Sequence, residues 1–349
     1  MDMEMAKKPI DSFDNPICSI CIANYNGVGI IGSALESVMA QDCDFPIEII
    51  VHDDASADGS VDFIRKNFPD IKLIVSRVNV GFCVSNNHMV SKARGKYILL
   101  LNNDAMLLPN AISTLYKEAC RQDIPGIFGL PQYNFFTDKL IDRGLLFDPF
   151  INTVPNLNTK RTDVGMVIGA CLWIPRTLWQ ELGGFPEWFH TLAEDMFLCC
   201  LARIRGYPVK IIHASGFLHR VGNSLGGGKV VSDRLSTSQK RRALSERNKS
   251  FVMALSYPSP FFQLIFPLHL TLLLLEGVFL CVVKKDINLF RSIYISCIRS
   301  LWHERRSLCH LRKAIQSSRN ISISRFFSAF TPIPYKLLML FKYGVPEIK

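Results

Sequence analysis

Paired metal-binding cysteines are missing from this sequence. Its 11 Cys are scattered. Cys18 and Cys21 have C-x-x-C spacing, but they lie in an apolar run and no second pair completes a zinc site, so buried thiols in a strand are favoured. Residues 1–14 are polar and mixed, without the apolar stretch of a signal peptide. We therefore expect the folded part of the chain to lie in a reducing cytosol.

A phosphate-binding glycine loop is also missing. Three consecutive glycines at 226–228 precede Lys229, but neither P-loop nor G-x-G-x-x-G context surrounds them. We interpret this stretch as a mobile lid or a connector.

Acidic residues are scarce near the C-terminal end. Residues 284–349 hold thirteen Lys or Arg and three Asp or Glu, while the whole chain has a net charge of +10. The excess positive charge is therefore confined to this segment. Its basic residues are interleaved with Leu, Ile and Phe rather than set in a nucleic-acid motif, so nucleic acid is not the partner that we expect.

Long apolar runs are few, and the longest covers residues 261–283. Its 23 residues are enough to cross a bilayer. Pro267, His269 and Glu276 disfavour a simple span, because polar groups are costly in hydrocarbon. A re-entrant or interfacial hairpin fits about as well, and a buried helical hairpin is the alternative without a membrane. Since apolar and basic residues coincide here, we expect contact with an anionic membrane surface.

The first 110 residues alternate short apolar runs with helical stretches. Strands are expected at 17–23, 47–51, 71–75 and 97–101, with helices at 30–40 and 60–67 and a loop that enters a helix at 81–93. Apolar strands flanked by polar turns are typical of an α/β parallel sheet covered on both faces. Further strands are expected at 128–133, 145–147 and 209–212, an apolar run at 164–174, and helices at 176–182 and 194–206.

Polar residues come immediately after three of the expected strands. The first strand runs into Asn24 and Tyr25, the second into Asp53, and the fourth into Asn102-Asn103-Asp104. The carboxyl ends of parallel strands form the ligand crevice of an open α/β sheet. The sequence therefore predicts a pocket for a nucleotide and its phosphates at this edge.

Several motifs in order resemble the inverting GT-A glycosyltransferases of family 2, rhamnosyltransferase-like branch. The resemblance covers residues 16–223 strongly and 245–320 weakly. It rests on 22–27, 52–60, 79–82 with 86–87, 93–104, 169–176, 183–187, 193–198 and 217–219. It implies a Rossmann-like GT-A domain with a mostly parallel mixed sheet and helices on both faces.

The resemblance also implies a donor site. A nucleotide-sugar would contact residues at the strand ends and the helix after the third strand: Ala23, Tyr25, Asp53, Asn87, Asn102, Asn103 and Asp104. The family's Asp-x-Asp motif falls on Asn102-Asn103-Asp104, so Asp104 keeps the metal-binding carboxylate and Asn102 departs from the pattern. Mg²⁺ or Mn²⁺, hard cations that take oxygen ligands, would be held by Asp104 and His219.

Asp195 falls on the family's catalytic base, which takes the proton of the acceptor hydroxyl. Glu194 and Trp188 are expected to support the loop or contact the acceptor. The motif Gln-x-x-Arg-Trp of processive members is absent, since Ala243 follows Arg242 where Trp would stand. Transfer of a single sugar is therefore expected.

Together these observations predict four segments: an N-terminal tail (1–15), a GT-A domain (16–225), a Gly-rich and basic connector (226–260) and a membrane-associating helical region (261–349). The expected reaction moves one sugar, rhamnose from dTDP-rhamnose as first choice, to a lipid-linked or glycan acceptor at the cytoplasmic membrane face of a bacterium. A UDP-hexose donor is the alternative. A sugar nucleotidyltransferase and a non-catalytic nucleotide-sugar-binding membrane subunit are the rival functions, and the oligomeric state stays open.

Overall fold

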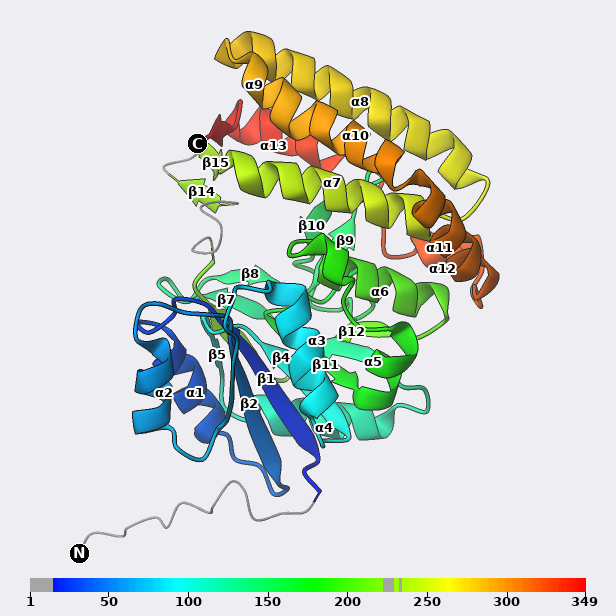
Figure 1. Ribbon diagram of the computed structural model, residues 1–349. Helices are drawn as coiled ribbons and strands as arrows, with labels where there is room; N and C mark the ends of the chain where they lie inside the picture. The colour runs from blue at the N-terminus through cyan, green and yellow to red at the C-terminus, as the bar shows by residue number, and fades with distance from the viewer. Residues whose placement is uncertain (1–14, 222–228, 232–233) are drawn as a thin grey trace, which may run out of the picture.

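A seven-stranded sheet forms the centre of the computed structural model, which describes residues 15–221, 229–231 and 234–349 (Figure 1). The strands, in sheet order, are β12 (Val209–Ile211), β6 (Ile127–Gly129), β11 (Cys171–Pro175), β4 (Tyr97–Leu101), β1 (Cys18–Asn24), β2 (Ile47–Asp53) and β3 (Lys72–Val75). Strand β11 is antiparallel to β4 and β6, and the other neighbouring pairs are parallel. The predicted mostly parallel mixed sheet is confirmed.

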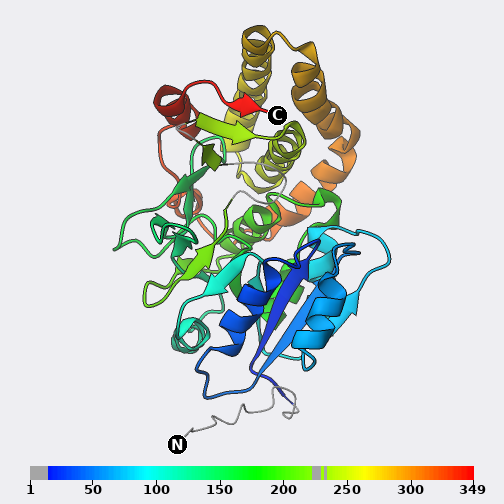
Figure 2. The same ribbon diagram turned by 90° about the vertical axis from the view of Figure 1, so that its left-hand side faces the viewer.

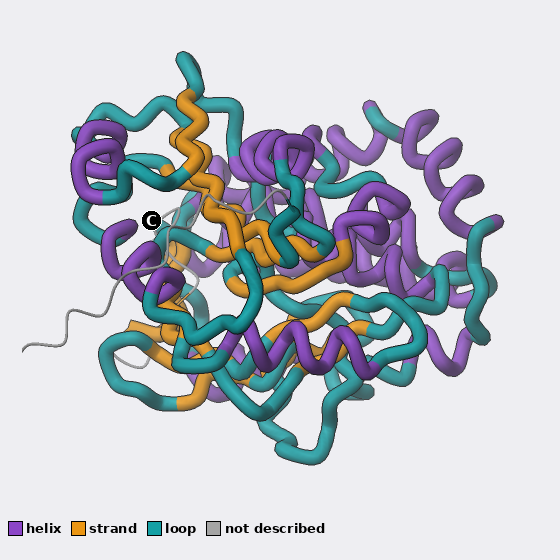
Figure 3. Tube along the Cα trace, turned by 90° about the horizontal axis from the view of Figure 1, so that it is seen from below, coloured by secondary structure: helices purple, strands orange, loops and turns teal. Residues whose placement is uncertain are grey.

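Side chains of β4 alternate between two buried cores, because successive residues of a strand point to opposite faces. Ile98 and Leu100 pack in one core, and Leu99 and Leu101 pack in the other. Helices lie on both sides of the strands, as Figure 3 shows. The first core includes residues of α3 (Phe82–Lys92), α5 (Arg176–Leu182), α6 (Glu194–Ile204) and α7 (Gln239–Ser256). The second includes residues of α1 (Ile31–Met39), α2 (Ser60–Asn67) and α4 (Ala111–Arg121).

A second, four-stranded sheet stands beside the carboxyl end of β4. Its order is β5 (Ala105–Leu107), β13 (Phe217–His219), β7 (Gln132–Asn134) and β8 (Leu140–Asp142). The antiparallel register of β5 and β13 pairs Ala105 with His219. The expected strand at 128–133 is thus divided between two sheets, as β6 and β7. A hairpin of β9 (Leu145–Phe147) and β10 (Thr153–Pro155) follows.

The predicted connector over 226–260 needs correction in its second half. Residues 239–256 form the 18-residue helix α7, which begins where the Ser238 side chain accepts a hydrogen bond from the Arg241 backbone N–H. Residues 246 and 248–256 of α7 are buried. A connector would be exposed, whereas this helix is part of the core. The glycines at 226–228 lie outside the described residues.

The remaining chain is helical (Figures 1 and 2). Residues 261–303 lie on the far side of α7 from the central sheet, whereas residues 305–327 run back toward the sheet and pack beside α6. This part of the chain comprises α8 (Phe261–Lys284), α9 (Ile287–Leu289), the π-helix η3 (Phe290–Ile295), α10 (Ser296–His303), α11 (Arg305–Ser317), α12 (Ile323–Phe327) and α13 (Tyr335–Tyr343). The chain ends in β16 (Glu347–Ile348), which pairs with β15 (Arg234–Thr237), itself paired with β14 (Lys229–Val231).

Helix α8 exposes one apolar face, which we call the apolar stripe. Its members recur every three or four residues, so they share one side of the helix. They are Leu264, Leu268, Leu272, Leu275, Phe279 and Val282, each at least 41% exposed. Two polar residues of α8 point inward instead: His269 Nε2 lies 2.9 Å from Ser250 Oγ, and Glu276 pairs with Arg242 and Lys336. Among the described residues, α8 is the one helix long and apolar enough to cross a membrane.

Candidate active site

Asn24 joins the ends of three strands. Its Nδ2 donates to Asp53 Oδ2 at 2.8 Å, and its Oδ1 accepts from Asn103 Nδ2 at 2.8 Å. Strands β1, β2 and β4 are neighbours in parallel, so their carboxyl ends meet here. The Asn24 amide therefore links the predicted crevice residues Asp53 and Asn103. From the sequence, Asn24 was expected only to be a polar residue at the end of the first strand.

Gly27 allows the turn after β1 to approach this amide pair. A Cβ at this position would lie 2.2 Å from Asn24 Oδ1 and 2.4 Å from Asn103 Nδ2, so any other residue would displace this amide pair. Tyr25, on the same turn, is 54% exposed, and Ala23 is half-buried in β1. An exposed aromatic ring beside a polar crevice is suited to stacking on a nucleobase.

Two adjacent carboxylates after β2 have different partners. Asp53 is fully buried and accepts from Asn24 Nδ2 and from the Ser56 backbone N–H. Asp54 accepts from the backbone N–H groups of Val80 and Gly81, at 2.7 and 2.8 Å. Asp54 thus fixes the loop before α3, a role that the sequence did not single out.

Asp104 and His219 lie side by side, as predicted. His219 Nε2 is 3.2 Å from Asp104 Oδ1, close enough for an ion pair if the ring is protonated. The other ring nitrogen, Nδ1, lies 2.8 Å from Gln132 Nε2, so Gln132 helps to set the tautomer. Gln132 was not predicted, because nothing in its own segment marks it.

The donor set at the end of β4 fits a hard cation. Asp104 Oδ1 and Asn102 Oδ1 are buried and make no aligned hydrogen bond among the described residues. Residues 15–221, 229–231 and 234–349 contain no group of three or more His, Cys, Asp and Glu placed to hold a metal. Mg²⁺ is commonly bound by one or two carboxylates together with substrate phosphates, so Asp104, Asn102 and His219 suit a cation that arrives with a diphosphate.

A two-residue segment links the end of β4 to Asp195. The Asn102 backbone N–H donates to Ala170 O at 3.1 Å. The Gly169 backbone N–H donates to Asp195 Oδ2 at 2.9 Å. Asp195 therefore stands across one short segment from the candidate metal ligands, which is where a base acting on the same reaction must lie.

The two carboxylates at the start of α6 differ in their protonation. Burial, and second the charge of the neighbouring Asp195 carboxylate, raise the pKa of Glu194 to about 8 against the opposing charge of Arg241. Burial also raises the pKa of Asp195, but two backbone N–H groups, of Gly169 and Met196, favour its charged form. Like charges this close are costly, so the negative charge resides on Asp195 while Glu194 stays protonated at neutral pH.

The loop before α6 is held in a strained shape by α7. His190, Leu192 and Ala193 all have positive φ angles, of 64°, 71° and 67°. Asn248 Nδ2 contacts three carbonyl oxygens of this loop within 3.1 Å, those of Phe189, Thr191 and Leu192. Strain at non-glycine residues persists only where surroundings enforce it. Asn248 is fully buried, and it holds the loop together with Arg247 and the Cys83 backbone N–H, which donate to Phe189 O and His190 O.

Two predicted residues flank this loop. Trp188 lies in the short 3₁₀ helix η1 (Glu187–Phe189), is 39% exposed and packs on Phe251. Asn87 donates through its amide to Phe185 O and Glu187 Oε1 and accepts from the Phe185 N–H, so both of its N–H groups hold residues 185–187. Its contact with a nucleotide-sugar stays a prediction.

Comparison with known sequences identifies glycosyltransferases among the proteins that this chain resembles. Residues 19–183 match the family described as "Glycosyl transferase family 2". The chain is 33% identical over 188 residues to a chondroitin synthase of Pasteurella multocida, which is 52% of this chain and 18% of that protein. It is 21% identical over 211 residues to an N-acetylglucosaminyl-diphospho-decaprenol L-rhamnosyltransferase of Mycobacterium tuberculosis, which is 52% of this chain and 69% of that protein.

The fold has solved counterparts. A mannosyltransferase from Pyrobaculum calidifontis, solved with GDP-Man and Mn²⁺, superposes with a TM-score of 0.52 at 16% identity, covering 91% of this chain and 89% of that one. The arrangement of the strands and helices is the GT-A fold. At this identity the likeness concerns the fold alone. The chain spans less than a third of the length of the first curated relatives that it matches.

Proposed function

Residues 19–183 of this chain belong to glycosyl transferase family 2, and from that membership we propose that the protein moves one sugar from a nucleotide-diphospho-sugar to an acceptor hydroxyl, with inversion. The observation that carries the proposal is the segment Gly169-Ala170. It hydrogen-bonds Asn102 beside the candidate metal ligands on one side and Asp195 on the other. Inversion by one in-line displacement needs a base and a leaving-group site on opposite faces of one sugar.

Asp195 is the proposed base. It holds the negative charge of the Glu194–Asp195 pair and accepts the proton of the acceptor hydroxyl as the glycosidic bond forms. The strand ends at Asn24, Asp53 and Asn103 would hold the nucleoside, with Tyr25 stacked on its base. Asn102 and Asp104, with His219, would hold Mg²⁺ or Mn²⁺, which supplies charge that stabilises the departing diphosphate.

Donor and acceptor are proposed from the relatives. The rhamnosyltransferase among them favours dTDP-rhamnose and a lipid-linked diphosphate acceptor, and a UDP-hexose is the alternative donor. A nucleotidyltransferase is less well supported, because the turn at 25–28 lacks a Gly-rich loop with a basic residue. A purely binding subunit is less well supported because Asp104 and Asp195 are both present. The apolar stripe and the basic C-terminal segment suit a position on the cytoplasmic membrane face.

The test is calorimetric titration of the full-length protein with a panel of dTDP-, UDP- and GDP-sugars, with and without Mn²⁺. We expect one nucleotide-sugar to bind tightly with Mn²⁺, and Asp104→Asn to weaken that binding about tenfold, the loss of one charged ligand contact. Asp62→Asn, which removes an exposed carboxylate of α2, should bind like wild type. Absence of binding across the panel, or Mn²⁺-dependent binding unchanged in Asp104→Asn, would contradict the proposal.

A further inference from the structure

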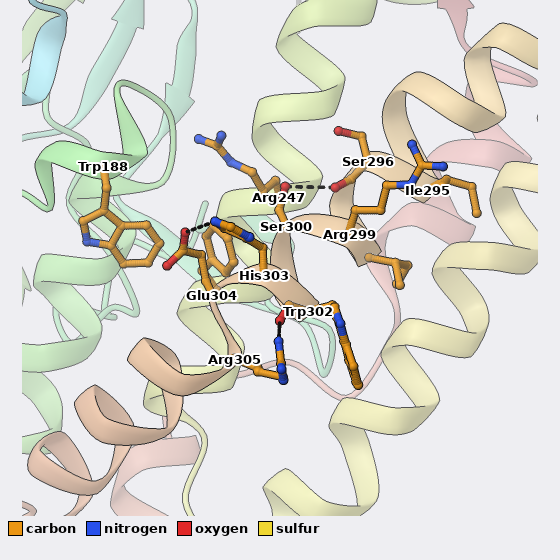
Figure 4. Close-up of a pocket in the computed structure, with 12 residues that line it drawn as sticks. Trp188, Arg247, Ile295, Ser296, Arg299, Ser300, Trp302, His303, Glu304 and Arg305 are labelled. Atoms are coloured by element: carbon orange, nitrogen blue, oxygen red, sulfur yellow. Dashed lines mark hydrogen bonds and ion pairs between the residues drawn. The ribbon is translucent and has the colours of Figure 1, made fainter.

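A cavity of about 820 Å³ lies away from the strand ends, between η1, α7 and α10 (Figure 4). This volume is in the range of sites that hold small ligands. Its wall brings the catalytic region and the C-terminal helices together. Aromatic and basic side chains dominate it, among them Trp188, Arg247, Phe251, Arg299, Trp302 and Arg305.

The charge of this wall favours an anion. The wall contains three guanidinium groups, those of Arg247, Arg299 and Arg305, and one carboxylate, that of Glu304, which lies 3.9 Å from His303 Nε2. Arg299 is exposed and makes no hydrogen bond or ion pair with any described residue. Guanidinium groups bind phosphate through paired N–H donors, so a phosphate or diphosphate is the anion that this set suits.

Apolar groups share the same wall. Trp302 is 69% exposed, and Ile295 and Ile298 also line the cavity. Helix η3 runs directly into α10 and packs closely on α8, where a Cβ at Gly277 would lie 2.6 Å from the Tyr294 ring. The cavity therefore belongs to the same helical layer as the apolar stripe. A ligand that fits has an anionic head and an apolar chain.

The cavity also adjoins the loop that carries the base. Arg247 donates through its NH2 group to Phe189 O at 3.2 Å, one residue after Trp188. Asn248, the next residue of α7, holds the same loop up to Leu192, two residues before α6. A head group bound at Arg247 would thus lie against the segment that leads to Asp195.

We propose that this cavity is the seat of a lipid-linked acceptor: its diphosphate contacts Arg247, Arg299 and Arg305, its apolar chain runs along Trp302, and its sugar points past Trp188 toward Asp195. The inference rests on the proposed glycosyl transfer and assigns a place in the fold to its lipid-linked acceptor. It assigns to the C-terminal helices a part of the substrate site in addition to any membrane contact.

The test uses the purified full-length protein and farnesyl diphosphate as a short probe, followed by quenching of tryptophan fluorescence. We expect saturable binding that is about tenfold weaker in Arg299→Gln, the loss of one charge-assisted contact. Arg306→Gln is the matched control, because Arg306 is an exposed arginine next to Arg305 that does not line the cavity. Equal affinities of wild type and Arg299→Gln would overturn the proposal.

Further ligands and one further variant distinguish the contribution of the diphosphate from that of the apolar chain, and a diphosphate acceptor from other lipid phosphates. Farnesol and inorganic pyrophosphate should each bind at least about tenfold more weakly than farnesyl diphosphate, because each supplies one of the two contacts. Trp302→Ala should weaken farnesyl diphosphate and leave pyrophosphate unchanged. Phosphatidylglycerol vesicles that displace the probe as well as unlabelled probe does would show a general seat for lipid phosphate and overturn the assignment to a diphosphate acceptor.

Nucleotide-sugar titration of the same variants separates this inference from the proposed function. Arg299→Gln should keep the donor affinity of wild type, since Arg299 lies in the C-terminal helices. A protein that binds farnesyl diphosphate but no nucleotide-sugar would contradict the proposed function and leave the cavity assignment standing. A protein that binds the nucleotide-sugar donor but not farnesyl diphosphate would contradict the cavity assignment and leave the proposed function standing.

Discussion

At the scale of single residues, Asn248 has the widest influence on the site. Its amide contacts the carbonyls of three loop residues, and the loop holds three non-glycine residues with positive φ. These conformations each cost about 1–3 kcal/mol when nothing enforces them. The position of Asp195, which follows directly, therefore depends on a side chain more than 50 residues away.

Asn248→Ala should relax this loop. We expect kcat to fall about tenfold or more, because a displaced base loses alignment, while the affinity for the nucleotide-sugar is unchanged. The melting temperature should also drop, since buried carbonyls lose their donor. Steady-state kinetics and calorimetry measure the two effects. The control is Asn67→Ala, which removes an exposed amide that donates to Phe63 O in α2. An equal kcat in Asn248→Ala and Asn67→Ala would contradict the role of Asn248.

Sequence motifs marked the residues that we propose to act directly and missed those that position them. Asp104, His219, Glu194 and Asp195 stand in recognisable runs, and the structure brings the first two within 3.2 Å. Asn248 and Gln132 act through tertiary contacts across dozens of residues, which no local pattern encodes. Asn87 shows the converse, since a residue within a motif turned out to hold a loop.

At the scale of elements, α8 combines an apolar stripe with an inner face that carries paired charges. Glu276 contacts both Arg242 of α7 and Lys336 of α13. A helix whose one side is packed against charged neighbours is poorly suited to cross hydrocarbon, where such groups are costly. We therefore propose, for α8, a position in the membrane surface with the stripe toward the acyl chains. Composition predicted the helix, but the exposed side follows from packing.

Leu264→Glu combined with Leu275→Glu should abolish binding to anionic vesicles. Both side chains lie on the stripe and are 68% and 59% exposed, so the folded state should tolerate the change. Each buried Leu contributes about 1.5–3 kcal/mol to apolar burial, so the double change should weaken partitioning more than tenfold. Vesicle co-sedimentation measures this. Ile124→Glu, at an exposed apolar position of the catalytic domain, is the control, and undiminished sedimentation of the double variant would contradict membrane contact through the stripe.

At the scale of the whole molecule, the C-terminal helices are joined to the catalytic domain by core contacts. Leu308, Ile315 and Phe326 are buried in the same core as residues of the central sheet. The Asn320 backbone N–H donates to Ile204 O at the end of α6. The sequence predicted the parallel strands and their order along the chain, whereas this joining, and the antiparallel entry of β11, come from contacts between distant segments.

A chain that ends at residue 260 should therefore lack a stable core. Removal of 261–349 exposes the apolar faces of α6 and α7, and we expect the truncated protein to lose the cooperative thermal transition of the full chain. Circular dichroism during heating measures this. A cooperative transition at the melting temperature of the full-length protein would show that the C-terminal helices are a separate unit. Membrane anchoring is consequently better tested by point changes than by this deletion.

A comparison of sugar transfer with donor binding in Asp195→Asn decides whether Asp195 is the base of an inverting transfer. We expect a loss of kcat of at least about a hundredfold, as for removal of a general base, with donor affinity close to wild type. Asp62→Asn should keep full activity.

The pH dependence of kcat in the same two proteins shows whether the group that titrates works in its deprotonated form. A base works when deprotonated, so wild-type kcat should rise with pH through the raised pKa of Asp195, above the usual range of an aspartate. Asp195→Asn should lose this acidic limb. Wild-type turnover in Asp195→Asn, or an unchanged acidic limb, would contradict the account.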